Sequence, residues 1–594
     1  MTSVHQLLHD RFGFSSFRGV QEEVVARAMA GENTLAVMPT GAGKSLTYQL
    51  PALARRGTGI VISPLIALMH DQVRSAEGFG IRAAALTSVS EDPRAIRDAL
   101  RDGKLDLLYV APERATSDAF ARLLHEADIA LFAIDEAHCV SEWGHDFRPD
   151  YRLLKPLLDQ HRDVPRLALT ATADRRTRAD ILVQLGIGED GLIVAGFDRP
   201  NIRYHVRPRD GVASQLKTLL KDQPGPGIVY ATSRNATEKL AEQLGSPGRR
   251  ALAYHAGLEG AVRQRNQSAF VASEDMVIAA TVAFGMGIDK PDVRFVSHAG
   301  IPKSIEAYYQ ETGRAGRDGD PAEAWLFWGA DDFARARRRI ETEVEAERRP
   351  QERERLNALA AFVEAATCRR AILLRHFGED PPERCGNCDN CLDPPATIDV
   401  STVAQKLLSA VFRTEMRFGV AHLAAVLGGD DNEKVRQFGH HQLSVFGIMD
   451  AEELALVRPV ARSLQARDAL RADDYGGLSF GPAAKAILKG EEKLVIAVPP
   501  KRVRRSRSGG GDLPHDPLFE ALRAWRRETA KAEGVPPYVI FHDATLRAVA
   551  AAKPSSLSAL SAIEGIGDTK LERHGESLLG ALATAMESDD ATAA

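Results

Sequence analysis

Short, uninterrupted apolar runs recur along the N-terminal part of the chain, and glycine, proline or polar residues end each of them. Residues 35–37 and 60–62 are two such runs, residues 129–134 follow the same pattern, and residues 105–110 do so apart from Asp106. A continuous apolar run of this length is typical of a strand buried on both faces of a parallel sheet. Segments such as residues 46–53 predict helices between these strands. The pattern therefore indicates an α/β fold.

The same pattern begins again near residue 208. Residues 227–230, 251–254 and 276–280 predict further buried strands, and residues 234–244 predict a helix. A second α/β unit therefore follows the first.

The C-terminal part of the chain reads as mainly helical. Residues 401–490 predict helices with a short strand pair near Leu478, and residues 515–585 predict a small helical bundle. Between them, residues 499–512 lack an apolar pattern and predict a flexible basic linker. Its side chains either touch phosphates or are simply solvated: Lys501, Arg502, Arg504, Arg505 and Arg507.

Length and composition narrow the class of protein. A chain of 594 residues has room for about four domains. No apolar run reaches the length of a membrane span, and the N-terminus lacks the pattern of an export signal, so a cytoplasmic location is expected. The net charge of −5 does not favour a nucleic-acid partner, but binding depends on local basic surface and not on the total.

Residues 38–45 have the composition of a phosphate-binding loop: Met38-Pro39-Thr40-Gly41-Ala42-Gly43-Lys44-Ser45. Gly41 and Gly43 let backbone N–H groups approach phosphate oxygens. Lys44 would reach the β- and γ-phosphates of a nucleotide, and the Ser45 hydroxyl would bind Mg²⁺. The first position departs from the general pattern, which has glycine there. The alternative is a glycine-rich surface turn.

Two carboxylates follow the apolar run 129–134. Asp135 is predicted to hold Mg²⁺ opposite Ser45, and Glu136 to orient or deprotonate the attacking water. His138 is placed to connect this site to a neighbouring motif.

A glutamine precedes the phosphate loop. The amide of Gln21 can both donate and accept, so it can read the edge of an adenine, with Phe17 and Arg18 nearby. An amphipathic helix would leave a similar pattern, and the assignment depends on the position before the loop.

Two arginines lie in the glycine-containing segment 308–319. Arg314 and Arg317 are three residues apart, which predicts that they share one face of a helical turn, close to Gln310. Arginines can stabilise the charge that develops on a γ-phosphoryl group during transfer. The alternative is a surface cluster of ion pairs.

The segment after His138 is rich in aromatic residues. Trp143, Phe147 and Tyr151 lie among too many polar residues for a core strand. They either stack on nucleic-acid bases and report this to the carboxylates, or pack the loop down.

Four of the five cysteines are clustered. Cys368, Cys385, Cys388 and Cys391 can complete a tetrahedral structural Zn²⁺ site. A disulfide pair is the alternative, and a reducing cytosol disfavours it. Cys139 lies outside this set.

The order of these motifs resembles superfamily-2 helicases, and the details resemble the RecQ family. The resemblance is carried by Phe17-Arg18-x-x-Gln21, the Asp135–His138 box, residues 139–148, residues 283–290 and residues 310–319. It covers nearly the whole chain. It implies two RecA-like lobes with ATP between them, and it implies that Asp289 and Gln310 also belong to the nucleotide site.

The resemblance also implies a domain order and an activity. The expected domains are lobe 1 (1–207), lobe 2 (208–340), a helical zinc-binding subdomain (341–400), a winged-helix domain (401–494), the linker (495–513) and an HRDC-like domain (514–588). The expected activity is ATP-dependent 3′→5′ unwinding of duplex and branched DNA, by translocation on single-stranded DNA, in repair and recombination. Expected partners are single-stranded and forked DNA and the single-stranded-DNA-binding protein, with no membrane, in the bacterial nucleoid.

Two other functions stay open. One is an RNA-dependent ATPase of the same superfamily, because the core motifs permit it. The other is a DNA-junction binding protein with a weak motor. The zinc cluster and the C-terminal domains favour DNA over RNA, and the intact motor residues favour an enzyme: Lys44, Asp135, Glu136, Arg314 and Arg317.

Overall fold

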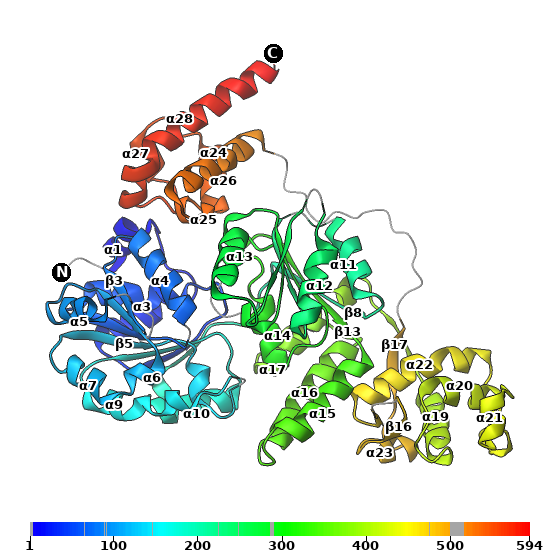
Figure 1. The fold of residues 1–594 in the computed structure, drawn as a ribbon. Coiled ribbons are helices and arrows are strands. Elements are labelled where there is room, and N and C mark those ends of the chain that lie inside the picture. Colours follow the sequence, from blue (N-terminus) through cyan, green and yellow to red (C-terminus); the bar gives the residue numbers. More distant parts are fainter. Residues whose placement is uncertain are drawn as a thin grey trace.

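The computed structural model describes residues 4–593 except 65, 88–89, 91, 145, 222, 224, 247–248, 285–289, 474–475 and 499–515. Two α/β lobes come first, a helical region and a small mixed domain follow, and a helical bundle ends the chain (Figure 1). The basic linker predicted over residues 499–512 lies outside the described residues.

Lobe 1 is built on a parallel sheet with the strand order β3-β4-β2-β5-β6-β1-β7. Its strands are β1 (Thr34–Val37), β2 (Thr58–Ile62), β3 (Ala83–Leu86), β4 (Leu107–Val110), β5 (Ile129–Ile134), β6 (Arg166–Thr170) and β7 (Leu192–Val194). Its helices are α1 (Val4–Phe12), α2 (Gln21–Ala30), α3 (Lys44–Ala54), α4 (Ile66–Gly78), α5 (Pro93–Arg101), α6 (Pro112–Ala115), α7 (Asp118–Leu124), α8 (Pro149–Arg152), α9 (Leu154–Gln160) and α10 (Arg175–Leu185). The apolar runs predicted as strands are confirmed, and every residue of β1, β2 and β4 is buried.

Lobe 2 is built on a second parallel sheet, in the order β10-β11-β9-β12-β13-β8. Its strands are β8 (Ile202–Pro208), β9 (Gly227–Tyr230), β10 (Ala251–Tyr254), β11 (Val277–Ala280), β12 (Phe295–His298) and β13 (Ala322–Trp328). Its helices are α11 (Val212–Lys221), α12 (Arg234–Leu244), α13 (Gly260–Ala272), α14 (Ile305–Thr312) and α15 (Ala330–Glu343).

The second lobe begins earlier than the expected boundary at residue 208. Strand β8 pairs with β13 over its whole length, so residues 202–208 belong to the second sheet. Buried and partly buried residues alternate along β8 because it is the edge strand. A search for continuous apolar runs therefore passes over it.

A helical region and a small mixed domain follow the lobes. The helical region contains α16 (Arg349–Glu364), α17 (Arg369–His376) and α18 (Asp389–Leu392). The mixed domain contains β14 (Ala396–Asp399), α19 (Ser401–Arg413), α20 (Val420–Gly428), α21 (Glu433–Gln437), α22 (Ala451–Ala466), β15 (Leu470–Ala472), β16 (Leu478–Phe480), α23 (Ala484–Leu488) and β17 (Val495–Val498). The strand pair predicted near Leu478 is β15–β16. Because β14 and β17 also pair, the mixed domain reaches beyond the expected limits of 401 and 494.

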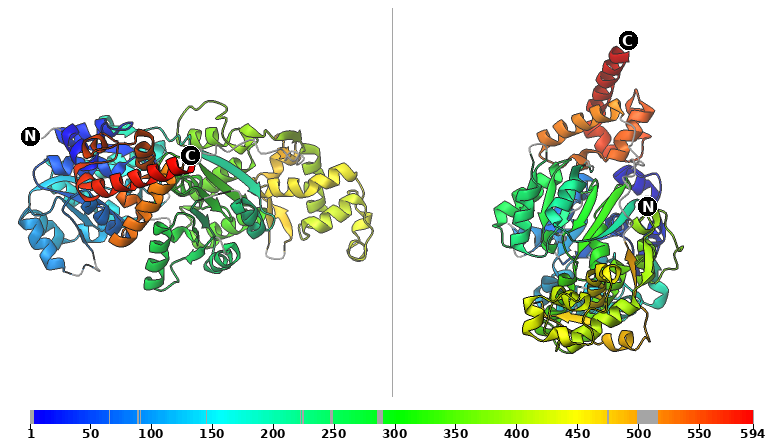
Figure 2. Two further views of the ribbon diagram at one scale, coloured as in Figure 1. Left: turned by 90° about the horizontal axis from the view of Figure 1, so that it is seen from above. Right: turned by 90° about the vertical axis from the view of Figure 1, so that its right-hand side faces the viewer.

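The C-terminal bundle contacts both lobes. It consists of α24 (Pro517–Glu533), α25 (Pro537–Ile540), α26 (Asp543–Ala552), α27 (Leu557–Ser561) and α28 (Asp568–Ala593), and α28 passes the expected domain end at 588. On lobe 1, the Gly565 N–H donates to the Gly13 carbonyl at 2.8 Å. On lobe 2, Arg547 Nη1 lies 2.7 Å from Asp320 Oδ2. The bundle therefore spans the boundary between the lobes (Figures 1 and 2).

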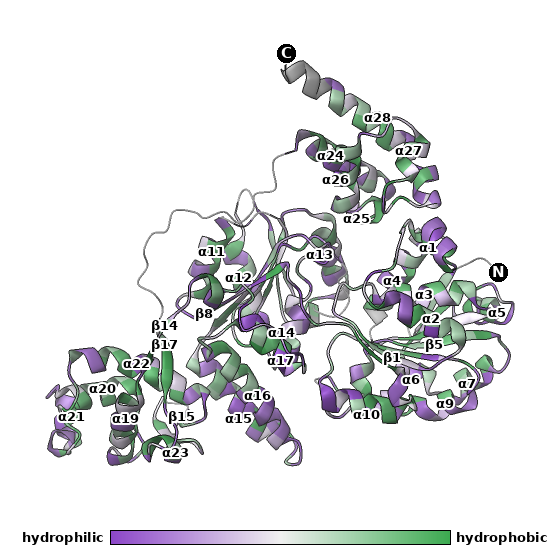
Figure 3. Cartoon of the chain, turned by 180° about the vertical axis from the view of Figure 1, so that it is seen from behind, coloured by the Kyte–Doolittle hydropathy of each residue, from purple (hydrophilic) through white to green (hydrophobic). Residues whose placement is uncertain are grey.

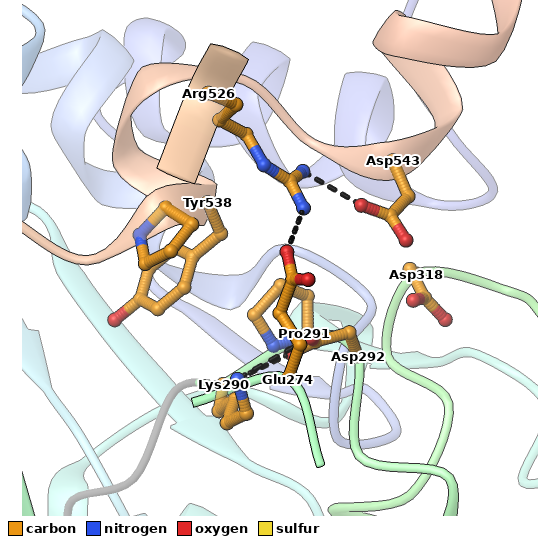
Figure 4. Close-up of a pocket in the computed structure, with 9 residues that line it drawn as sticks. Glu274, Lys290, Pro291, Asp292, Asp318, Arg526, Tyr538 and Asp543 are labelled. Carbon is orange, nitrogen blue, oxygen red and sulfur yellow. Dashed lines mark hydrogen bonds and ion pairs between the residues drawn. The ribbon is translucent and has the colours of Figure 1, made fainter. Parts of the chain in front are cut away.

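One partly buried glutamate of lobe 2 carries much of this contact. The Glu274 carboxylate forms ion pairs with three arginines of α24: Arg523, Arg526 and Arg527. Figure 4 shows Arg526 reaching from the bundle toward Glu274, while its other end pairs with Asp543 at 2.6 Å. Burial raises the pKa of Glu274, and the three guanidinium groups outweigh burial, so its pKa lies below the ordinary value.

The distribution of apolar residues matches this arrangement. In Figure 3 the strands of both sheets are largely hydrophobic, and polar residues concentrate on the outer helices. Among the described residues, no helix combines the length and the apolarity needed to cross a lipid bilayer.

Candidate nucleotide-binding site and zinc centre

The loop between β1 and α3 has the backbone shape that its glycines predict. Gly41 and Gly43 both have positive φ, at 86° and 74°, which costs glycine little and other residues more. Helix α3 begins at Lys44, directly after Gly43. The N-terminus of α3 therefore faces the space in front of the loop, where it favours an anion.

Gln21 packs against this loop. Its Nε2 donates to the Ala42 carbonyl at 2.9 Å, and its Oε1 accepts from the Arg18 N–H at 2.9 Å. A Cβ added to Gly43 would lie 2.4 Å from Gln21 Nε2. The glycine at this position is therefore also needed for the close approach of Gln21.

Asp135 and Glu136 directly follow β5 and lie next to the loop. Burial, and secondarily the charge of Glu136, raises the pKa of Asp135 to about 6, while Lys44 acts in the opposite direction. Gln72 Nε2 donates to Asp135 Oδ2 at 3.3 Å, and the Glu136 N–H donates to Oδ1 at 2.9 Å. Glu136 has a left-handed backbone, with φ of 48°. Such strain in a non-glycine residue is found where the surrounding structure fixes a side chain for function.

His138 links these carboxylates to β6. Its Nδ1 lies 3.0 Å from the Thr170 hydroxyl and 3.4 Å from Glu136 Oε2. Burial lowers the pKa of His138 to about 4, so the ring is neutral near pH 7. The sequence places His138 as a bridge to a neighbouring motif, and the structure has this bridge.

Arg314 and Arg317 lie in a turn, and the prediction of a shared helical face is wrong. Helix α14 ends at Thr312, and residues 313–319 form turns. Gly316 has a φ of 56°, which stops the helix from continuing. The segment 313–317 is called the arginine turn below.

The arginine turn lies against the phosphate loop of the other lobe. A Cβ added to Gly41 would lie 3.3 Å from Arg317 Cγ, and one added to Gly313 would lie 3.2 Å from Thr40 Cβ. Arg314 is 7% exposed. Two motifs more than 260 residues apart in the sequence therefore meet at one site.

Of the two other predicted site residues, only Gln310 lies within the described part of the chain. Gln310 lies on α14, in the turn of helix before Thr312. Asp289 lies outside the described residues.

The aromatic-rich segment is held by cations and by one deeply buried ring. The guanidinium of Arg176 lies 3.1 Å from the centre of the Trp143 ring, and that of Arg152 lies 5.3 Å from Phe147. Tyr151 is fully buried, and its hydroxyl donates to the Asp135 carbonyl at 3.0 Å. Tyr151 thus holds the backbone of Asp135 and packs the loop down. Trp143 and Phe147 keep both alternatives, base stacking and packing.

The comparisons with known proteins agree with this geometry. The DEAD/DEAH box helicase model matches residues 18–181, and the helicase conserved C-terminal domain matches residues 211–319. The chain is 43% identical over 581 residues to the ATP-dependent DNA helicase RecQ of Haemophilus influenzae, covering 96% of this chain and 94% of that protein. The chain belongs to the RecQ family.

The other domains of this RecQ chain match in the expected order. The RecQ zinc-binding model matches residues 330–392, the RQC domain residues 394–505, and the HRDC domain residues 515–582. The RecQ helicase of Pasteurella multocida is 43% identical over 96% of this chain and 91% of its own length. That of Bacillus subtilis is 38% identical over 96% of this chain and 97% of its own length.

The four cysteines of the RecQ zinc-binding region converge on one point. Their sulfur atoms all lie within 4.8 Å of one another. The distances are 3.9 Å from Cys385 Sγ to Cys391 Sγ and 3.9 Å from Cys388 Sγ to Cys368 Sγ. Four thiolates at Zn–S bonds of about 2.3 Å lie roughly 3.8 Å apart around a tetrahedral ion. The cluster therefore fits a structural Zn²⁺, and none of the five cysteines forms a disulfide.

One residue at the candidate nucleotide site of this RecQ protein was missed by the sequence reasoning. Arg199 lies between β7 and β8, and it bonds to the phosphate loop and to the arginine turn together. Its partners are backbone carbonyls, which leave no signal in a side-chain pattern. The adjoining Pro200 and Asn201 indicate only a turn.

Proposed function

We propose that this RecQ protein is an ATP-dependent DNA helicase whose nucleotide site lies between the phosphate loop and the arginine turn. The observation that supports this most directly is the close approach of Arg317 to Gly41, where an added Cβ would lie 3.3 Å from Arg317 Cγ. A nucleotide held by one lobe would meet arginines of the other, so binding and hydrolysis would change how the lobes are held together.

The residues have separate tasks in this proposal. Lys44 and the N–H groups of the loop bind the phosphates, and Gln21 contacts the adenine together with Phe17 and Arg18. Ser45 and Asp135 would hold Mg²⁺, which would neutralise charge on the β- and γ-phosphates. Glu136 orients or deprotonates the attacking water. Arg314 and Arg317 stabilise charge on the transferred phosphoryl group.

The nucleic acid is proposed to be DNA. The relatives named above are DNA helicases, they match over nearly the whole chain, and the RQC and HRDC domains follow the motor as in the family. Translocation from 3′ to 5′ on single-stranded DNA, and a role in repair and recombination, are what the family membership favours. Two further points stay predictions: binding to the single-stranded-DNA-binding protein, and a cytoplasmic location in association with the nucleoid.

The test is ATP hydrolysis without nucleic acid, with single-stranded DNA and with single-stranded RNA of the same sequence. We expect DNA to stimulate hydrolysis and RNA to do so much less. Duplexes with 3′ and 5′ tails then test the direction, and unwinding should need the 3′ tail.

Other outcomes would select another function. Equal or stronger stimulation by RNA would favour an RNA-dependent ATPase. Tight binding of DNA junctions without hydrolysis under any condition would favour a junction-binding protein with a weak motor.

A further inference from the structure

The side chain of Arg199 binds four backbone carbonyl groups at the contact between the two lobes. Its Nη1 donates to the Thr40 carbonyl of the phosphate loop at 2.7 Å. The other three acceptors belong to the arginine turn, at 3.1, 3.0 and 2.8 Å: the carbonyls of Gly313, Ala315 and Gly316. One guanidinium group thus joins the two segments that the proposed function places on either side of the phosphates.

Only arginine can make this set of bonds. The guanidinium is planar, and its two terminal nitrogens carry four N–H bonds in fixed directions. A lysine ammonium has three donors on a single atom, so it cannot reach carbonyls that are spread over both ends of the fork. Any of these partly buried carbonyls that loses its donor pays the cost of an unmade hydrogen bond.

The chain around Arg199 is fixed on both sides. The Phe197 ring stacks on Phe377 with 4.6 Å between centroids, and the Tyr309 hydroxyl donates to the Phe197 carbonyl at 2.7 Å. Asn201 Nδ2 donates to the Gly316 and Asp320 carbonyls at 2.8 and 2.9 Å. Arg199 therefore starts from a rigid backbone, and a rigid support is what a positioning side chain needs.

The structure also places Arg199 next to the charge of Arg317. Burial first, and the charge of Arg317 after other contributions, lowers the pKa of Arg199 from its ordinary value. The terminal N–H groups of Arg199 donate to backbone carbonyls, and the dipoles of these carbonyls offset part of its charge. The two arginines therefore differ: Arg199 holds the turn, and Arg317 has its Cβ and Cγ close to Gly41 of the phosphate loop.

We propose that Arg199 is a positioning residue for ATP hydrolysis, which sets the arginine turn against the phosphate loop when the lobes close. This inference rests on the proposed function, because it acts through Arg314 and Arg317. It predicts a defect in turnover and in binding of the transition state, with little effect on binding of ADP, which depends mainly on lobe 1.

The experiment compares Arg199→Lys and Arg199→Ala with the wild type. Displacing catalytic groups by about 1 Å costs on the order of 100-fold in rate, so we expect DNA-stimulated kcat to fall by about 10- to 100-fold. KM for ATP should change by less than about threefold, since lobe 1 keeps its contacts. The affinity for ADP should remain that of the wild type. The affinity for ADP with aluminium fluoride, which serves as the transition-state analogue, should fall by about tenfold or more.

A matched control removes an arginine of the same kind elsewhere. Arg166 also donates to two backbone carbonyls, those of Leu158 and Leu185, but only within lobe 1. Arg166→Lys should leave unchanged both the kcat and the affinity for the transition-state analogue. The melting temperature and the zinc content show whether each variant is folded.

Two outcomes would overturn the inference. Full kcat in Arg199→Lys would show that charge alone is enough and that the fork has no role. A double-mutant cycle adds a second criterion: in an Arg317→Ala background, Arg199→Lys should cost little, because both act through one turn. Additive losses would contradict this. If Arg317→Ala retains wild-type hydrolysis, the proposed function itself fails, whatever Arg199 does.

Discussion

The ammonium group of Lys44 is held by the loop that it would share with a nucleotide. Its Nζ donates to the Met38 carbonyl at 3.2 Å and lies 3.5 Å from that of Pro39. These weak contacts orient the group near the start of α3 without burying its charge. A phosphate oxygen is a stronger acceptor than a carbonyl and can take over these bonds.

Lys44→Ala should therefore abolish ATP hydrolysis while leaving DNA binding intact. Loss of one charged donor at a transferring phosphoryl group costs about 10²- to 10³-fold in kcat. The assay is phosphate release with single-stranded DNA, together with DNA binding by fluorescence anisotropy. Lys155→Ala is the control, because Lys155 lies on the surface of lobe 1. Wild-type turnover in Lys44→Ala would remove the loop from the proposed site.

A second prediction at the residue scale concerns pH and His138. The ordinary histidine pKa is about 6.5, and burial lowers that of His138 to about 4. Between these values the unfolded chain binds a proton that the folded chain does not. The contribution of neutral His138 to the free energy of unfolding is thus complete above pH 6.5, and it is lost as the pH falls toward 4.

The comparison that isolates this group is the wild type against His138→Asn, which does not titrate. From pH 7.5 to pH 5, the stability of the wild type relative to the variant should fall by about 2 kcal/mol. Unfolding in urea at several pH values measures it. A difference that does not depend on pH would mean that His138 binds a proton as readily in the folded protein as in the unfolded chain, so that burial does not lower its pKa.

At the scale of elements, the zinc cluster joins the loop after α16 to the segment around α18. Cys368 precedes α17, and the other three cysteines lie on a short stretch that begins at Cys385. Because the four ligands come from two separate stretches of chain and converge on one point, we expect the folding of this region to depend on metal binding.

Cys388→Ser should therefore lose bound zinc and lower the melting temperature. Serine does not supply the thiolate that the ion needs, and three ligands hold zinc more weakly than four. Metal analysis of the purified chain and thermal unfolding are the measurements. Cys139→Ser serves as the control for zinc content, because Cys139 is buried in lobe 1 outside the cluster. This variant should keep its bound zinc. Full zinc content in Cys388→Ser would contradict a four-cysteine site.

Elements were predictable from sequence where one local signal determined them. Buried parallel strands such as β2 and β5 are continuous apolar runs, and the glycines of the phosphate loop fix its shape. The edge strand β8 and the arginine turn were not read correctly. In β8 the burial alternates. In the turn, a spacing of three favours a helix, and Gly316 at positive φ overrides it.

At the scale of the whole molecule, the site depends on contacts that no local pattern encodes. Arg199 matters because carbonyls of residues 40 and 313–316 meet around it. The contact of the HRDC domain with lobe 2, called the HRDC seat below, depends on Glu274 and on arginines about 250 residues later in the chain. Each of these side chains looks like an ordinary surface charge in the sequence, and only the tertiary fold brings them together.

The HRDC seat gives the last prediction. Glu274 is 10% exposed at its side chain and faces three guanidinium groups. Glu274→Lys would therefore put a fourth cation against them and leave Asp543 as the one ion-pair partner of Arg526 within the described residues. Like charges at such separations in a partly buried site repel strongly.

We expect the HRDC domain to leave the lobes in Glu274→Lys, and not in Glu242→Lys, which makes the same charge change on α12, away from the seat. Small-angle scattering should show a larger radius of gyration, and amides near Gly565, which bonds to Gly13, should exchange faster. The HRDC domain itself should stay folded, because its core is separate from the seat. Moderate salt should weaken the wild-type contact only in part, because burial limits screening. Unchanged scattering and exchange in Glu274→Lys would show that packing against lobe 1, and not this ion-pair cluster, holds the domain in place.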